Sequence, residues 1–259
     1  MGLRALDPLD GPLDARDYGN ALHLGLETFV KAHRKALPKD AQARLKQSFE
    51  RAMAQTGYAD YDIAKEAARL ENIAARAVDW MTERRASGWA VIGEELGAKY
   101  LIDDKNFTLT GTVDLIEKGP LGFAVTDYKT GAPSTIAIVK AGFDPQLPLT
   151  AFLLSQGAIK GAGRGETEEL NYIRLKGAGE STFENPLTYD KKGVYPAMDY
   201  AADAIGGLRS LIEEFDKPET AYACQPRAQY THDYSDYNHL ARRDEWMRLG
   251  AEDSKGAGE

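Results

Sequence analysis

The sequence contains only one cysteine, Cys224, among its 259 residues. A single thiol cannot form a disulfide within the chain, and it cannot provide the several thiolate ligands of an iron–sulfur cluster or a sulfur-rich zinc site. We therefore expect no iron–sulfur cluster held by this chain and no internal disulfide.

Long apolar runs are also missing. No stretch approaches the roughly 18 apolar residues that span a bilayer. The first ten residues, MGLRALDPLD, have no apolar signal-peptide core. We expect a cytoplasmic protein that makes no membrane contact. The printed sequence also contains no G-x-x-x-x-G-K-[ST] motif, so it includes no nucleotide-driven helicase of that type.

Basic residues are in the minority. The chain has 32 Lys and Arg against 40 Asp and Glu, a net charge of −8. This balance argues against a broadly basic nucleic-acid-binding surface. It does not exclude a nuclease, because an active site built from carboxylates is acidic without its metal and a partner can supply most of the DNA contacts.

A β-hairpin is predicted at the centre of the chain. Its arms, 107–117 and 121–128, are rich in apolar and β-branched residues, and the Gly-Pro pair at 119–120 is a turn signal. The hairpin also carries three charged residues for which packing alone has little use: Asp114, Asp127 and Lys129.

These three charges predict a metal site. Asp127 and Lys129 are two positions apart, so they point to the same face of a strand, and a hairpin of this length brings Asp114 opposite the end of the second arm. Carboxylates this close repel each other unless a cation lies between them, and hard oxygen ligands suit Mg²⁺ or Mn²⁺. The alternative is that these are ordinary solvated residues at strand ends.

Other polar residues are candidates for the site, and each could instead be an ordinary packed or solvent-exposed side chain. His23 follows small residues on a predicted helix, so it is either a metal ligand or a packed or surface imidazole. Gln146 lies in the first turn of a predicted helix, where its amide either reaches the strand ends or stays in solvent. Either Glu94 or Glu95 points towards the carboxylates, or both face solvent at a strand edge.

The predicted elements are helices and strands in mixed order. Helices are predicted from Asp17 as N-cap, at 38–57, at 61–87, at 143–156 with Asp144 as N-cap, at 195–215 and at 239–249. Strands are predicted at 89–102, along the hairpin, at 169–176 and at 183–186, with a loop at 132–142. Arg84 and its neighbouring arginines are expected in solvent. The order predicts an α/β or α+β sheet flanked by helices.

Four ordered motifs carry a resemblance to a known family. They are G-N-A-L-H ending at His23, G-T-V-D ending at Asp114, D-Y-K-T-G beginning at Asp127, and Q-L beginning at Gln146. In this order the sequence resembles the RecB-like branch of the PD-(D/E)xK nuclease superfamily. Further stretches, including FDPQLPL and ELNYIRLKG, are similar to AddB-type nuclease domains, so the resemblance covers nearly the whole chain.

The resemblance implies a fold and a set of roles. The fold would be a restriction-endonuclease-like core, a mixed sheet flanked by helices. His23, Asp114, Asp127 and the carbonyl of Tyr128 would hold Mg²⁺ or Mn²⁺. Lys129 would orient or deprotonate the attacking water and stabilise phosphate charge, and Gln146 would position Lys129 or the substrate strand.

The implied function is a metal-dependent DNA exonuclease that acts in double-strand break repair and recombination. It would cut single-stranded ends delivered by an AddA-like helicase partner subunit. The implied domains are an extended leader at 1–15, the nuclease domain with its N-terminal helical part at 16–222, and a tail at 223–259 with a disordered end.

Two departures from the family pattern stand out. The frequent G-R-I-D-R pattern is G-T-V-D-L here, so DNA contacts from those arginines are missing. Some AddB-type nucleases carry a four-cysteine iron–sulfur staple, which one cysteine cannot form. Two other functions stay open: a nuclease-fold module that binds DNA ends or a partner without cleavage, and a metal-dependent hydrolase of another substrate.

Overall fold

The computed structural model describes residues 13–177, 183–190, 193–222 and 242. The chain divides into two compact units, Leu13–Glu214 and a second formed by Met1–Pro12 with Phe215–Glu259. The helices and strands described below belong to the first unit, apart from the last residue of the final helix.

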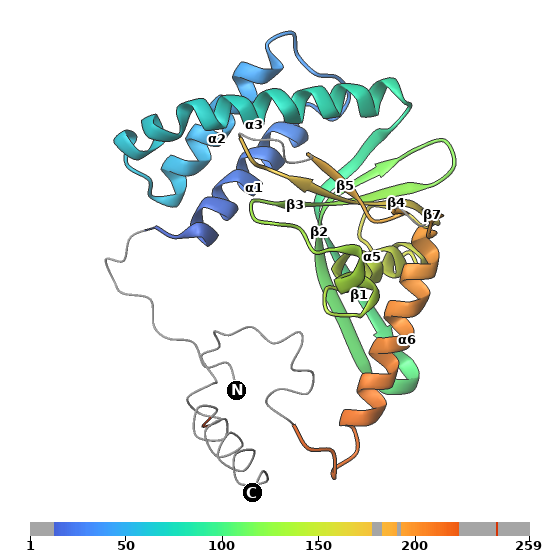
Figure 1. Ribbon diagram of the computed structural model, residues 1–259. Coiled ribbons are helices and arrows are strands. Elements are labelled where there is room, and N and C mark those ends of the chain that lie inside the picture. The colour runs from blue at the N-terminus through green and yellow to red at the C-terminus, as the bar shows by residue number, and fades with distance from the viewer. Residues whose placement is uncertain (1–12, 178–182, 191–192, 223–241, 243–259) are drawn as a thin grey trace, which may run out of the picture. The chain divides into compact units, whose positions relative to one another are not determined.

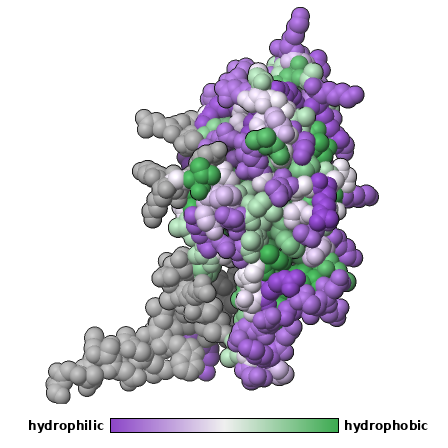
Figure 2. All heavy atoms as spheres, turned by 90° about the vertical axis from the view of Figure 1, so that its right-hand side faces the viewer, coloured by the Kyte–Doolittle hydropathy of each residue, from purple (hydrophilic) through white to green (hydrophobic). Residues whose placement is uncertain are grey.

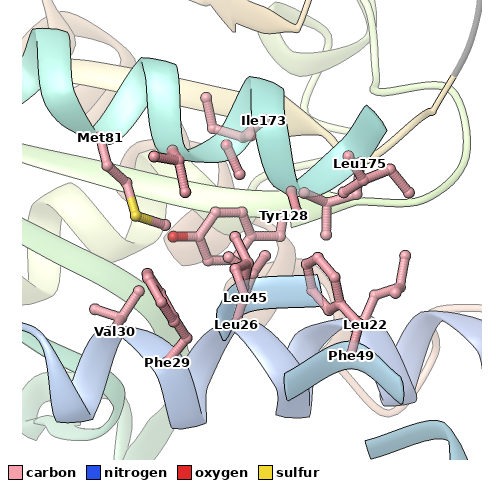
Figure 3. Packing of buried hydrophobic residues seen from close by; sticks show 14 of the residues in the cluster. Leu22, Leu26, Phe29, Val30, Leu45, Phe49, Met81, Tyr128, Ile173 and Leu175 are labelled. Carbon is pink, nitrogen blue, oxygen red and sulfur yellow. The ribbon is translucent and has the colours of Figure 1, made fainter. Parts of the chain in front are cut away.

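Three helices form a layer on one side of the sheet (Figure 1): α1 (Ala15–Ala32), α2 (Ala41–Thr56) and α3 (Asp60–Ala86). Their apolar stripes meet in one core, where Leu22 and Leu26 of α1 pack with Leu45 and Phe49 of α2 (Figure 3). Gly25 permits the close crossing of α1 and α2, since a Cβ there would lie 2.6 Å from Cδ1 of Phe49. This packing fixes α1 against the sheet.

The sheet has five strands in the order β1-β2-β3-β4-β5. Their bounds are Ala90–Ile102, Phe107–Lys118, Phe123–Lys129, Thr167–Arg174 and Glu184–Pro186. β3 and β4 run parallel, while the other neighbouring pairs are antiparallel, so the sheet is mixed. The 3-10 turn η1 (Asp103–Lys105) joins β1 to β2, and β6 (Tyr189–Asp190) with β7 (Gly193–Val194) forms a separate ribbon.

The second face of the sheet is covered by α5 (Gln146–Ser155) and α6 (Ala197–Phe215) (Figure 1). Strand alternation sorts the side chains between the two cores: Val125 and Tyr172 pack on this side, whereas Tyr128 and Ile173 pack against α1–α3. The predicted fold class, a mixed α/β sheet flanked by helices, is therefore confirmed.

The start of α1 differs from the prediction. Asp14, not Asp17, is the N-cap: its carboxylate accepts the backbone N–H groups of Arg16 and Asp17 at 2.7 and 3.0 Å. The Asp17 carboxylate accepts the Asp14 N–H in return at 3.0 Å, which completes a capping box. Two aspartates three residues apart share the task that the sequence pattern assigned to one.

The segment before α5 also differs. Residues 132–142, predicted as a loop, include the short helix α4 (Ile136–Lys140), whose N-cap Thr135 accepts the Ile138 N–H. The N-cap of α5 is Pro145 rather than Asp144. Asp144 is otherwise engaged, because its Oδ2 accepts the Tyr172 hydroxyl at 2.9 Å.

Parts of the sequence interpretation concern residues outside the described ranges. They are the leader up to residue 12, the helix at 239–249, Cys224 and the end of the chain. Among the residues that the structure describes, no helix is long and apolar enough to cross a membrane. The face shown in Figure 2 is largely hydrophilic, with apolar residues scattered over it.

Candidate functional site

His23 reaches the end of β3 from α1. Gly19, one turn earlier, lets the helix approach closely, since a Cβ there would lie 3.3 Å from the Thr130 hydroxyl oxygen. The His23 Nε2 lies 2.8 Å from the Tyr128 carbonyl oxygen, and Nδ1 lies 3.5 Å from Oδ2 of Asp114. A carbonyl oxygen only accepts, so Nε2 carries the proton. With Nε2 at the carbonyl, Nδ1 is the ring nitrogen that faces the Asp114 carboxylate.

Asp114 connects the two arms of the hairpin beyond the last paired residues. The β2–β3 pairing stops at Leu115 and Thr126. Past this point, Oδ2 of Asp114 accepts the backbone N–H of Tyr128 at 2.8 Å. The Asp114 carboxylate is thereby fixed beside both His23 and the Tyr128 carbonyl.

Asp127 is a buried carboxylate, 3% exposed. The Lys129 ammonium lies 2.8 Å from its Oδ2 in an ion pair. Burial, followed by the negative charge of Asp114, raises the pKa of Asp127 to about 6. The Lys129 ammonium acts in the opposite direction without cancelling these effects. Asp127 is therefore a buried carboxylate whose negative charge the neighbouring groups do not fully stabilise.

Lys129 is held between the sheet and α5. Its Nζ donates to Oε1 of Gln146 at 3.3 Å and lies 5.7 Å from the centre of the Tyr172 ring. The Tyr172 hydroxyl donates to Asp144, two residues before Gln146. This bond ties the start of α5 to β4, and with it the amide that contacts Lys129.

The predicted site residues thus lie together around the C-terminal end of β3, the central strand of the sheet. They are His23, Asp114, Asp127, Tyr128, Lys129 and Gln146. A comparison with protein-family models gives this cluster a context. The model of the PD-(D/E)XK nuclease superfamily matches residues 1–234. The chain belongs to the PD-(D/E)XK nuclease superfamily. A search of curated proteins found no match.

Membership of the PD-(D/E)XK superfamily indicates metal-dependent nuclease activity on DNA, typically with Mg²⁺ or Mn²⁺. The donor set fits such an ion. His23, Glu95 and Asp114 each offer a ligand atom, and these atoms lie within 4.8 Å of one another. Carboxylate oxygens with one imidazole suit a hard divalent cation, with the imidazole favouring Mn²⁺ over Ca²⁺.

Glu95 is the member of this nuclease site that the sequence left undecided. The β1–β2 register is shifted between Val91 and Gly93, and Glu95 has a positive φ of 48°. This irregularity turns Glu95 towards Asp114. Burial and the Asp114 charge raise the pKa of the Glu95 carboxyl. Glu94 points elsewhere and is paired with Arg34.

A groove of about 550 Å³ runs beside the nuclease site. Its walls come from one face of α1, from Glu95 on β1, and from the end of β3 with the loop after it. Glu95 and Asp114 lie together in the groove beside His23, and Arg16 and Lys129 line it as well. The groove makes the cluster accessible from the surface.

Proposed function

We propose that this chain is a Mg²⁺- or Mn²⁺-dependent DNA exonuclease that hydrolyses phosphodiester bonds at single-stranded ends. The observation that carries the proposal is the group of His23, Glu95 and Asp114, whose ligand atoms lie within 4.8 Å of one another. Buried Asp127, paired with the ammonium of Lys129, is close enough for the Asp114 charge to raise its pKa. An excess of carboxylates aimed at one point is costly in a protein unless a cation is bound there.

Each residue has a proposed role. His23, Asp114, Asp127 and the Tyr128 carbonyl would hold the ion, and Glu95 would join them. Bound there, the ion would lower the pKa of a water and neutralise charge on the phosphate. Lys129 would orient the attacking water or, as the neutral amine, take its proton, and as an ammonium it would stabilise the developing negative charge. Gln146, which accepts from Nζ, would hold Lys129 in place.

A narrower proposal concerns the biological setting. The stretches similar to AddB-type nuclease domains support a role in double-strand break repair beside an AddA-like helicase subunit. The net charge of −8 also fits a nuclease that receives its strand from a partner instead of capturing DNA with a basic surface. The nuclease domain of this assembly would occupy 16–222.

A nuclease assay with matched lysine variants tests the proposal. The wild-type protein is incubated with Mg²⁺ or EDTA and with linear single-stranded DNA, circular single-stranded DNA, duplex DNA or RNA. Lys129→Ala is compared with Lys35→Ala, which changes an exposed lysine in the α1–α2 connection. The proposal expects Mg²⁺-dependent loss of linear single strands by wild type and Lys35→Ala, and none by Lys129→Ala.

Each other outcome has a meaning. Cutting of circular DNA shows endonuclease action. Metal-dependent binding without cleavage favours a DNA-end-binding module, and activity only on other phosphodiesters favours a different hydrolase. Equal cleavage by wild type and Lys129→Ala, with both proteins folded by circular dichroism, contradicts the proposed role of Lys129.

A further inference from the structure

The groove extends along α1 well beyond the acidic cluster. Arg16, Asn20, His23 and Glu27 recur at intervals of three and four residues, so they share one face of the helix, and all four line the groove. Thr130 and Gly131 line it as well, from the loop after β3. One helix face thus carries both the imidazole of the nuclease site and an arginine about two turns away.

The groove-lining residues of α1 change from basic to acidic along the helix, from Arg16 to Glu27. Glu27 and Glu95 lie near His23, whereas the earlier turns offer a guanidinium and an amide, with the Thr130 hydroxyl close to Gly19. The helix N-terminus itself contributes little here, because the Asp14 carboxylate already accepts the N–H groups of Arg16 and Asp17. The positive charge of this end comes from the Arg16 side chain, which also interacts electrostatically with the Asp14 carboxylate.

We propose that Arg16 and Asn20 form a subsite for the backbone of the DNA strand, in which the Arg16 guanidinium binds a phosphate other than the scissile one. This inference rests on the proposed nuclease function. Guanidinium groups bind phosphate oxygens with two parallel hydrogen bonds, and the Asn20 amide offers a further donor to the sugar or base. The acidic end is left to the metal and the scissile phosphate.

The helix geometry sets the length of strand that the subsite needs. Arg16 precedes His23 by seven residues, which is about 10 Å along an α-helix. A stacked strand rises about 3.4 Å per nucleotide, so this distance corresponds to roughly three nucleotides. The contribution of Arg16 should therefore appear only with substrates longer than about three nucleotides.

Binding measurements test the subsite without relying on cleavage. Fluorescence anisotropy of labelled single-stranded oligonucleotides is recorded with Mg²⁺ in a Lys129→Ala background, and again in EDTA with the unaltered chain. Arg16→Ala should weaken binding of a ten-nucleotide strand by roughly three- to tenfold and lower the salt dependence by about one counterion. Arg16→Lys should recover part of the affinity, because lysine keeps the positive charge but cannot make the two parallel hydrogen bonds of a guanidinium.

A control variant and a length series make the test selective. Arg51→Ala removes an exposed arginine of α2 that does not line the groove, and it should leave affinity and salt dependence unchanged. A dinucleotide should bind Arg16→Ala and the parent equally. In the cleaving protein, Arg16→Ala should raise KM for long strands while kcat stays unchanged.

The inference and the proposed function fail separately. The subsite is overturned if Arg16→Ala and its parent bind long strands with equal affinity. It is also overturned if Arg16→Ala weakens the binding of a dinucleotide as much as it weakens the binding of a ten-nucleotide strand. Length-dependent binding through Arg16 in a protein that never cuts DNA leaves the subsite standing and rejects hydrolysis. Arg16 is exposed and Ala suits a first helical turn, so matching melting temperatures should show that the variant folds.

Discussion

Two clusters of charged residues on the same sheet differ in how their carboxylates are paired. In the first, Arg84 of α3 donates from Nε to Glu117 of β2 at 2.9 Å and from Nη1 to Glu169 of β4 at 2.5 Å. Asn171 also donates to Glu169, and the Trp89 ring lies 4.2 Å from the guanidinium carbon. The chain itself supplies partners for both carboxylates.

The second cluster lacks such compensation. Asp114, Asp127 and Glu95 face one lysine and one imidazole, and Oδ2 of Asp127 has no hydrogen bond. Burial is the largest cause that raises the pKa of both Glu117 and Asp127. The next cause at Glu117 is the Arg84 charge, which opposes the rise, whereas the next at Asp127 is the Asp114 charge, which adds to it and is opposed in turn by Lys129. In the first cluster both carboxylates have partners within the chain, although Nη2 of Arg84 makes no hydrogen bond, and the second cluster is built to receive a cation. Removing one carboxylate charge from the first cluster should therefore lower stability more than activity, and removing one from the second should lower activity more than stability.

The largest expected effect is on catalysis. Asp127→Asn should reduce nuclease activity by roughly a thousandfold or more, because it removes a metal ligand and the ion-pair partner of Lys129. Glu117→Gln should keep near wild-type activity per folded molecule. Initial rates on single-stranded DNA with saturating Mg²⁺ compare the two; similar losses in both variants would erase the distinction between the clusters.

Stability should show the reverse order. Glu117→Gln leaves the buried guanidinium of Arg84 with one less counter-charge, and the free energy of unfolding should fall by about 3 kcal/mol. Asp127→Asn in EDTA at pH 7 should leave it unchanged or raise it, since a repelled buried charge is removed. Urea unfolding followed by circular dichroism measures both. A clear loss of stability in Asp127→Asn would mean that the cluster is structural.

The raised pKa of Asp127 also predicts a pH dependence in metal-free protein. Its value of about 6 in the fold, against 3.8 for an unperturbed aspartate, means that the folded state holds more protons between these pH values. Stability from this group is therefore greatest below pH 4, falls as pH rises to about 6, and then stays level. The total is at most about 3 kcal/mol. The unfolding free energies of wild type and of Asp127→Asn are measured in EDTA from pH 4 to 7. The wild-type value minus the variant value should fall as pH rises to about 6, and a difference that does not change with pH would contradict the prediction.

The smallest expected effect concerns the support of Lys129. Tyr172→Phe removes the hydroxyl that holds Asp144 and keeps the ring, so it should lower kcat roughly fivefold, a cost of about 1 kcal/mol, with little change in KM. Tyr100→Phe, at a ring packed against Phe152, is the matched control and should have no effect. Equal kcat in all three proteins would show that the hydroxyl does not position the site.

Regular alternation made part of the site predictable. Two-residue spacing on a strand placed Asp127 and Lys129 on one face, and the turn at 119–120 set Asp114 against the second arm. The position of Gln146 in the first turn of its helix left its amide either at the strand ends or in solvent, and only the family resemblance implied a contact with Lys129 or the substrate strand. The structure places the amide beside Lys129. The fold class followed from the order of helices and strands.

Irregular and long-range features were not predictable. The register shift in β1 and the positive φ of Glu95 break alternation, so the sequence did not decide between Glu94 and Glu95. Arg84 was expected in solvent but is 7% exposed, because Glu169, 85 residues later, covers it. Asp144 has the sequence of a helix cap, yet its partner is the Tyr172 hydroxyl, 28 residues away.

Mn²⁺ binding, measured by calorimetry on metal-free protein, tests most directly whether the second cluster is built for a cation. Wild type and Glu117→Gln should bind the ion with similar affinity, and Asp114→Asn and Asp127→Asn should bind at least roughly tenfold more weakly. Absence of binding to the wild-type protein, or equal binding to all four proteins, would contradict the account.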